Sequence, residues 1–309
     1  MNFIYAIYYW LPDFSRIGIF GKIINRLLAK LIKIIFDKFV PNYFLKTTKT
    51  AGFGLNTTER AEKYIVSLTS FPARINDVWI TVETILRQSF KPDKIILWLA
   101  ESQFPDKKIP ESLLKLKERG LTITFCEEDI RSHKKYLFAL EKFPNEFIIT
   151  LDDDLYYDKD LLKNLIAIKN LHPNCIATNR AHQIQFNSNS ILPYRKWKHN
   201  VTTNIPSHSI VQTGGFGTIY KKSDLFFAFN NKDLIKQIAF HADDLWLKMM
   251  CFLNNKKVVT NNKYNKDPIT VKSSQIEKLV TFNVLEGGND EQLNSIVKYF
   301  NINIKDLNE

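Results

Sequence analysis

A buried strand that runs straight into three consecutive carboxylates constrains this chain more than any other feature. Phe147–Leu151 is an apolar and β-branched run, and Asp152, Asp153 and Asp154 follow it directly. Unpaired carboxylates are heavily penalised in a dry interior, so the strand must carry them to an open edge. Hard oxygen ligands in this number suit Mg²⁺ or Mn²⁺ held between protein and phosphates. The alternative for an acidic triplet is a solvated loop or a helix N-terminus.

Strand and helix signals alternate from residue 63 to residue 170. The predicted strands are Tyr64–Leu68, Lys94–Leu99, Leu121–Phe125 and Phe147–Leu151, and the predicted helices are Asp77–Arg87, Pro110–Lys117, Ser132–Glu141 and Lys159–Asn170. This alternation predicts an α/β fold with a largely parallel sheet covered by helices on both faces. Ligands bind at the carboxyl ends of the strands in such sheets, which places the three aspartates at the active edge.

The second half of the chain is less regular and contains two further motifs. Thr213–Gly217 is a glycine cluster without the dinucleotide or Walker spacing, but it permits close approach of the backbone to a ligand. Asp243 and Asp244 open a predicted helix, where carboxylates also occur because they stabilise a helix N-terminus. That helix is predicted over Leu245–Asn254, a polar loop over 261–274, and helical character around Leu279–Leu285 and Leu293–Phe300.

The formal charge of +11 is concentrated near the N-terminus. Residues 1–50 carry eight basic and two acidic side chains, so six of the eleven excess charges lie there. Residues 16–39 have a helical period with two faces. One face is apolar (Ile17, Phe20, Ile24, Leu27, Leu28, Leu31, Ile35) and another is basic (Lys22, Arg26, Lys30, Lys33). This pattern predicts a helix that lies in a membrane interface or, alternatively, one packed on the main domain or a partner subunit.

Four segments occur in a recognisable order along the chain. They are Ser67–Arg74, Glu128–Tyr136, Thr150–Asp154, and Gly214–Gly217 followed by Ala242–Trp246. In this order they resemble the GT-A-fold glycosyltransferases, more closely the family-2-like bacterial transferases of capsule and lipopolysaccharide sugars. The resemblance covers residues 63–260 and implies a GT-A (Rossmann-like) sheet flanked by helices. It also implies metal-dependent transfer of a sugar from a nucleotide-sugar donor to a saccharide or lipid-linked glycan acceptor in surface polysaccharide synthesis.

The resemblance also implies roles for individual residues. Asp154 and Asp152 would bind Mn²⁺ or Mg²⁺, with Asp153 as a spacer in the donor site, although a triple acid leaves this assignment open by one position. Asp244 would be the catalytic base, and Asp243 would support it or hold an acceptor hydroxyl. The other donor-binding candidates are Thr69, Ser70, Arg74, Asp129, Lys134, Lys135, Gly214 and Gly215.

Two departures from the family pattern stand out. No histidine follows His241 to serve as a C-terminal metal ligand. The catalytic motif is Asp-Asp instead of the commoner Glu-Asp, which leaves inversion or retention open.

The patterns divide the chain into four parts. Residues 1–45 form the basic, membrane-associating helical segment, 46–62 a linker, 63–260 the catalytic domain and 261–309 a C-terminal loop and helices. Within the catalytic domain, 63–178 is expected to bind the nucleotide and 179–260 the acceptor. We expect a protein in the cytoplasm, peripherally associated with anionic lipids on the cytoplasmic face of the inner membrane. The three scattered cysteines indicate neither a disulfide framework nor a zinc site.

Two other classes of protein share part of this pattern. One is a different aspartate- and Mg²⁺-dependent diphosphate enzyme of the all-α type, which needs an acid where Tyr156 or Tyr157 stands. The other is a non-enzymatic basic protein that binds membranes or nucleic acid. No recognition helix, zinc finger or RNA-binding aromatic signature accompanies the charge, so we expect no nucleic-acid partner.

Overall fold

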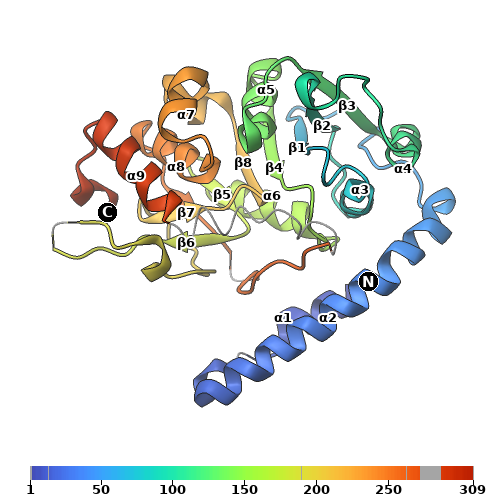
Figure 1. Ribbon diagram of the computed structural model, residues 1–309, viewed down its shortest axis with the longest axis horizontal. Coiled ribbons are helices and arrows are strands. Elements are labelled where there is room, and N and C mark those ends of the chain that lie inside the picture. Colours follow the sequence, from blue (N-terminus) through green and yellow to red (C-terminus); the bar gives the residue numbers. More distant parts are fainter. Residues whose placement is uncertain (1, 13, 189, 262, 272–286, 309) are drawn as a thin grey trace.

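The strand that ends in the three aspartates lies at the centre of the main sheet (Figure 1). The computed structural model describes residues 2–12, 14–188, 190–261, 263–271 and 287–308. A seven-stranded sheet has the order β3-β2-β1-β4-β8-β5-β9, in which only β8 is antiparallel to its neighbours. The predicted α/β fold, a mostly parallel GT-A (Rossmann-like) sheet flanked by helices, is confirmed, and this sheet excludes the all-α alternative.

The first half of the domain follows the predicted alternation closely. Its elements are β1 (Tyr64–Thr69), α3 (Val78–Leu86), β2 (Lys94–Ala100), α4 (Glu111–Leu114), β3 (Leu121–Cys126), α5 (Lys134–Lys142), β4 (Phe147–Leu151) and α6 (Leu161–Leu171). The helix predicted at Pro110–Lys117 is only one α-helical turn, and a 3₁₀ segment continues it over Lys115–Arg119. Gly120 then ends that segment with a φ of 115°, a conformation that favours glycine.

The second half adds mostly short strands and three helices. Its elements are β5 (Ile176–Thr178), β6 (Ala181–Gln183), β7 (Ile210–Gln212), β8 (Phe216–Tyr220), α7 (Lys232–Ile238), α8 (Asp243–Leu253), β9 (Val258–Val259) and α9 (Gly288–Tyr299). α9 confirms the helix predicted around Leu293–Phe300. The helical character predicted at Leu279–Leu285 lies outside the described residues.

The sheet separates two apolar cores, as the period-two alternation of its strands requires. Ile65 and Ile148 face the core formed with α5 and α8, whereas Val66 and Ile149 face the core formed with α3 and α6. Both faces of the central strands are therefore dry, and polar groups can meet only where the strands end. This arrangement confines a site to the edge at which β1, β4 and β8 meet.

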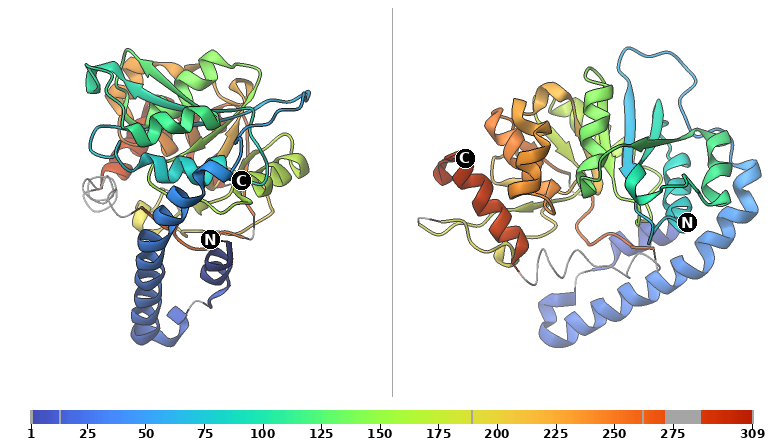
Figure 2. Two further views of the ribbon diagram at one scale, coloured as in Figure 1. Left: turned by 90° about the vertical axis from the view of Figure 1, so that its right-hand side faces the viewer. Right: turned by 45° about the horizontal axis from the view of Figure 1, so that its top comes forward.

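The N-terminal helices form a third packed cluster. α1 (Asn2–Trp10) is followed by α2 (Gly18–Thr47), which passes the predicted boundary at residue 45 and contains Pro41. Four residues of α2 spaced four apart (Ile32, Phe36, Val40, Phe44) are buried against Ile80, Tyr156, Ile269 and Val271. The packing alternative is therefore correct for this inner face of α2. In the left view of Figure 2, the N-terminal part of α2 projects beyond the α/β domain.

Among the described helices, none combines the length and the apolar character needed to cross a membrane.

The inner face of α2 yields a stability prediction. Phe36 is fully buried and meets Tyr156 with ring centroids 5.1 Å apart, whereas Phe39 on the same helix is 59% exposed. Phe36→Ala should cost about 3–5 kcal/mol of unfolding free energy because it leaves a cavity. Phe39→Ala, the matched control, should change it by less than about 0.5 kcal/mol. Urea denaturation followed by circular dichroism measures both, and equal effects would contradict the packing of α2.

Candidate active site

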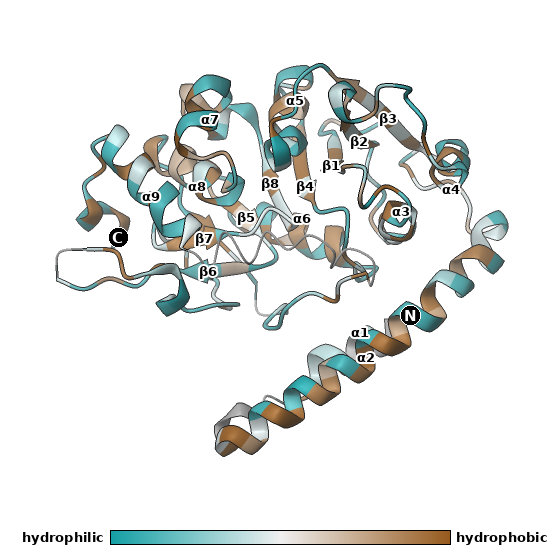
Figure 3. Cartoon of the chain, in the orientation of Figure 1, coloured by the Kyte–Doolittle hydropathy of each residue, from teal (hydrophilic) through white to brown (hydrophobic). Residues whose placement is uncertain are grey.

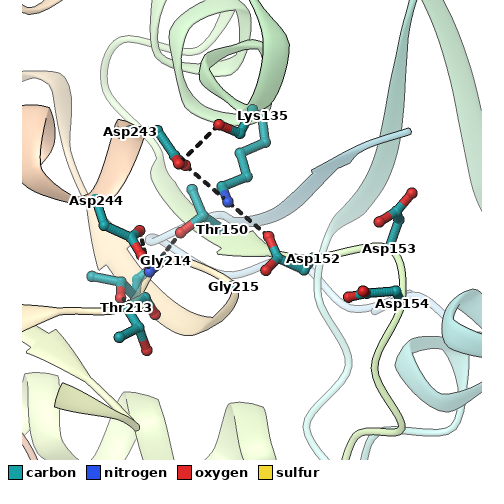
Figure 4. Close-up of polar contacts among 12 residues, drawn as sticks. Lys135, Thr150, Asp152, Asp153, Asp154, Thr213, Gly214, Gly215, Asp243 and Asp244 are labelled. Carbon is teal, nitrogen blue, oxygen red and sulfur yellow. Dashed lines mark hydrogen bonds and ion pairs between the residues drawn. The ribbon is translucent and has the colours of Figure 1, made fainter. Parts of the chain in front are cut away.

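Three chain segments meet at the carboxyl end of β4 (Figure 4). β8 runs antiparallel to β4, with Thr218 opposite Thr150 and Phe216 opposite Leu151. This register places the turn before β8 beside the aspartates, and the Asp152 amide donates to the carbonyl of Gly215 at 3.1 Å. The first turn of α8 brings Asp243 and Asp244 to the same place. The antiparallel insertion of β8 thus joins two motifs that lie far apart in the sequence.

Lys135 links the two acidic motifs. Its side chain is 4% exposed, and its ammonium lies 2.7 Å from Asp152 and 2.9 Å from Asp243. Burial opposes the charged form of a lysine, but the carboxylates of Asp152, Asp243 and Asp244 outweigh burial and raise the pKa of Lys135 well above its usual value. Lys135 is therefore a fixed positive charge between the two acidic motifs.

The two aspartates of α8 have opposite electrostatic environments. Asp243 accepts a hydrogen bond from the Ser132 hydroxyl at 2.8 Å, and Lys135 holds its pKa below the ordinary value despite burial. Asp244 accepts a hydrogen bond from the Gly214 amide at 2.7 Å. Burial, followed by repulsion from Asp243, raises the pKa of Asp244 to about 7. A carboxyl group with this pKa can exchange a proton near neutral pH.

The glycines of the turn are required by the space around them. A Cβ at Gly215 would lie 1.9 Å from a carboxylate oxygen of Asp152, closer than atoms can approach. A Cβ at Gly214 would lie 3.0 Å from the Asp244 carboxylate and would crowd its hydrogen bond. Both predicted glycines therefore lie against the acids. Close packing on Asp152 and Asp244 explains why glycine is needed at these two positions.

The three consecutive aspartates do not share one environment. In Figure 4 the carboxylates of Asp152 and Asp154 point in a common direction, and that of Asp153 points away. Asp153 accepts hydrogen bonds from the Ser70 hydroxyl and from Arg74 at 2.9 Å, and burial raises its pKa. Arg74 also lies 3.1 Å from Asp154. Asp153 thus anchors the loop to the end of β1, in keeping with a spacer position.

Some predicted donor-binding residues lie apart from the carboxylates of Asp152, Asp243 and Asp244. The Thr69 hydroxyl donates to the carbonyl of Trp98 at 2.8 Å. Lys134 points to Asp129, and this ion pair does not involve any of those carboxylates. Of these two candidate lysines, Lys135 is the one that contacts the carboxylates of Asp152 and Asp243.

Three supporting residues were not identified from the sequence. Ser132 holds Asp243, and the Tyr157 hydroxyl donates to the carbonyl of Gly215 at 2.5 Å and accepts from the Asp152 amide at 2.9 Å. His133 is buried between Tyr136 and the carbonyl of Ala239, each 2.8 Å away, and burial lowers its pKa to about 4. Ser132 lies three residues before Lys135, a helical spacing that could have marked the pair as neighbours.

The acids fit a cation that is shared with a phosphate ligand. Within the described ranges, no group of three or more His, Cys, Asp or Glu side chains is placed to hold a metal ion. Mg²⁺ is commonly bound by one or two carboxylates together with waters and substrate phosphates. Asp152 and Asp154 could supply such a pair, and the Asp152 side chain is 43% exposed. The donor set fits Mg²⁺ or Mn²⁺ with a diphosphate and does not fit an all-protein cage.

Comparisons with known proteins give structural matches of low sequence identity. No protein-family model matches the sequence, and no curated protein matches it either. Residues 1–349 of S. aureus TarS match at 18% identity and a TM-score of 0.40, over 65% of this chain and 59% of that one. 4-Diphosphocytidyl-2C-methyl-D-erythritol synthase from Anaerococcus prevotii shares 14% sequence identity at a TM-score of 0.44. The match covers 75% of this chain and 100% of that one.

A third match is the mannosyltransferase PcManGT from Pyrobaculum calidifontis, solved in complex with GDP-Man and Mn²⁺. It shares 10% identity at a TM-score of 0.48, over 89% of this chain and 76% of that one. The chain thus covers about three fifths of the TarS fragment and three quarters of PcManGT. At these identities and TM-scores, the matches do not establish a family for this chain.

The central lysine yields a prediction about stability. Lys135→Met should cost about 3–5 kcal/mol at neutral pH, because it leaves the buried Asp243 without its cation. Lys135 lowers the pKa of Asp243, so this stabilisation is present at neutral pH and is lost as pH falls through the folded-state pKa. The difference between wild type and variant should therefore narrow in acid.

The double variant Lys135→Met/Asp243→Asn is the control for the central-lysine prediction. It should recover part of the loss at neutral pH, since the unpaired buried charge is then absent. Urea denaturation across pH measures all three proteins. A loss that does not depend on pH and is not recovered would show that Lys135 acts through packing alone.

Proposed function

We propose that this protein is a metal-dependent glycosyltransferase that moves a sugar from a nucleotide-sugar donor to a saccharide or lipid-linked glycan acceptor in surface polysaccharide synthesis. One observation carries the proposal. A carboxyl group with a pKa of about 7, Asp244, lies across from the carboxylates of Asp152 and Asp154, and the Lys135 ammonium pairs with both Asp152 and Asp243. This arrangement combines a base with carboxylates that could hold a cation against a leaving diphosphate.

The leaving-group side is formed by Asp152, Asp154 and Lys135. A nucleotide sugar breaks at the anomeric carbon, and the bond electrons leave with the diphosphate. Mg²⁺ or Mn²⁺ held by Asp152 and Asp154 would supply electrostatic stabilisation of that charge when bound. Lys135 contributes a fixed charge beside Asp152. Its burial keeps this charge in a region of low dielectric, where it interacts more strongly than in water.

Asp244 serves as the base on the acceptor side. The acceptor hydroxyl oxygen forms the new bond to the anomeric carbon, and its proton passes to the Asp244 carboxylate. The Gly214 amide fixes the orientation of that carboxylate, and Asp243 raises its proton affinity. We assign Asp243 a supporting role, because its own pKa is lowered and it is held by Ser132 and Lys135.

The nucleoside is proposed to lie toward the end of β1. Ser70 and Arg74 are tied there to Asp153, and Asp129 lies in the connection between β3 and α5, where it pairs with Lys134. In this assignment Thr69, Ser70 and Arg74 shape the donor site, and Asp129 meets the base or ribose. We place the protein at the cytoplasmic face of the inner membrane, where nucleotide sugars and lipid-linked acceptors would meet.

The donor side can be tested by binding. A thermal-shift screen of nucleotide sugars with Mn²⁺ should show one preferred donor, since a ligand that binds the folded state stabilises it by mass action. Asp154→Asn should abolish the dependence of that shift on Mn²⁺. Donor stabilisation that persists unchanged in excess chelator would contradict the role of the cation.

The base can be tested by separating turnover from binding. Asp244→Asn should lower kcat about 10²–10⁴-fold, because it removes general base catalysis. Its donor Kd should stay within a few fold of wild type, whereas Asp154→Asn should weaken donor binding. Steady-state kinetics and calorimetry give the two quantities. If Asp244→Asn lost kcat and donor affinity equally, Asp244 would be a donor-binding residue and not the base.

The pKa of Asp244 gives a pH profile. The carboxylate form is the active base, so kcat/KM should rise with pH through an apparent pKa near 7. Asp243→Asn removes a repelling negative charge, so its acidic limb should move to lower pH. If the acidic limb of the kcat/KM profile did not move in Asp243→Asn, the titrating group would not be Asp244.

A further inference from the structure

The outer face of α2 exposes a large apolar surface. Six large apolar side chains of its N-terminal half are exposed: Ile19, Phe20, Ile23, Ile24, Leu27 and Leu31. Phe20 is 80% exposed and Leu27 is 62% exposed. Figure 3 shows these apolar stretches along α2, interrupted by hydrophilic ones. Contiguous apolar surface of this kind on a folded protein marks a binding surface.

The part of the domain that the structure describes does not cover this surface. The side of α2 that packs on the domain is its inner face, centred on Ile32, Phe36, Val40 and Phe44. The six exposed residues lie N-terminal to that contact, on the part of α2 that projects outward in Figure 2. α2 thus has one apolar face that holds the helix to the protein and another that is available to a partner.

The charges around the outer face select an anionic partner. Lys22, Arg26 and Lys30 lie on the basic face of the same stretch of α2 and are exposed. Asp37 is the single acidic residue in α2, and it lies 3.3 Å from Lys33 and 3.2 Å from the Tyr156 hydroxyl. A second copy of this chain would bring like charges together across the contact, which costs energy. An anionic lipid surface accepts both the apolar side chains and the cations.

We propose that α2 lies flat on an anionic membrane, with its outer face inserted at the level of the lipid headgroups. Helices of this type bury an apolar face to a depth of about 5–10 Å and do not span the bilayer. The inner face of the same helix contacts the acidic loop, because Phe36 and Asp37 meet Tyr156, two residues after Asp154. The carbonyl of Asp154 also accepts from the Val271 amide at 2.8 Å, within the cluster that α2 covers. Docking through α2 therefore holds the acidic edge beside the membrane.

The test uses the full chain and vesicles of phosphatidylcholine with or without phosphatidylglycerol. Co-sedimentation should show binding to the phosphatidylglycerol vesicles, and added salt should weaken it. The triple variant Phe20→Glu/Ile24→Glu/Leu27→Glu should bind at least about tenfold more weakly, because it places negative charge on the outer face that would insert into the membrane. The matched control is Leu171→Glu/Ile205→Glu/Phe227→Glu, since these residues are 78%, 75% and 80% exposed outside α2, and it should bind like wild type.

Two further measurements separate lipid binding from its alternatives. Lys22→Gln/Arg26→Gln/Lys30→Gln should keep its far-UV circular dichroism and lose the preference for phosphatidylglycerol. Sedimentation velocity should show the same oligomeric state for wild type and for the Phe20 triple variant. The proposal would be overturned if wild-type protein bound neither kind of vesicle. It would also be overturned if the wild type were a dimer that dissociates in the triple variant. Unchanged vesicle binding by the triple variant would overturn it as well.

Discussion

The arrangement of the site depends on the ammonium of Lys135. It lies between carboxylates that come from β4 and from α8, and it is almost completely buried. Without that charge, the carboxylates of Asp152, Asp243 and Asp244 would repel one another, and the buried Asp243 would have no cation beside it. With it, one carboxylate keeps its charge and its neighbour, Asp244, has a pKa of about 7. A single cation therefore allows two acids at adjacent positions of one helix to differ in protonation.

The sequence was sufficient to predict most of the fold. Apolar runs such as Phe147–Leu151 and the helical period of Val78–Leu86 correspond to buried elements, because burial and periodicity are local properties of the chain. The position of β8 was not predictable in the same way. Its antiparallel placement between β4 and β5 depends on contacts between distant segments. That placement is what brings Gly214 and Gly215 to the aspartates, and before the structure their proximity was implied only by the family resemblance and not by local patterns.

Within the site, the sequence identified the pair of lysines and the three consecutive aspartates as candidates. The structure shows that the residues of each set have different partners. Lys134 and Lys135 are equivalent as neighbouring basic residues, yet they point to different acids because adjacent residues on a helix face different directions. Asp153 is the member of the acidic triplet that turns toward Ser70 and Arg74. Arg74 also reaches Asp154, whereas Asp152 pairs with Lys135. The sequence shows that these neighbouring side chains must differ in direction. Only their three-dimensional surroundings decide which of them contacts which partner.

The two interpretations of the N-terminal segment describe different faces of one helix. The apolar face predicted over residues 17–35 includes Phe20 and Leu27, which are exposed, whereas the residues that pack on the domain continue to Phe44. Because the packed residues recur every four positions, they form a narrow stripe that leaves much of the circumference free. A helix that only packed on the domain would need polar residues around the rest of that circumference. Ile19, Ile23 and Leu31 are there instead, so packing on the domain alone does not account for the composition of α2.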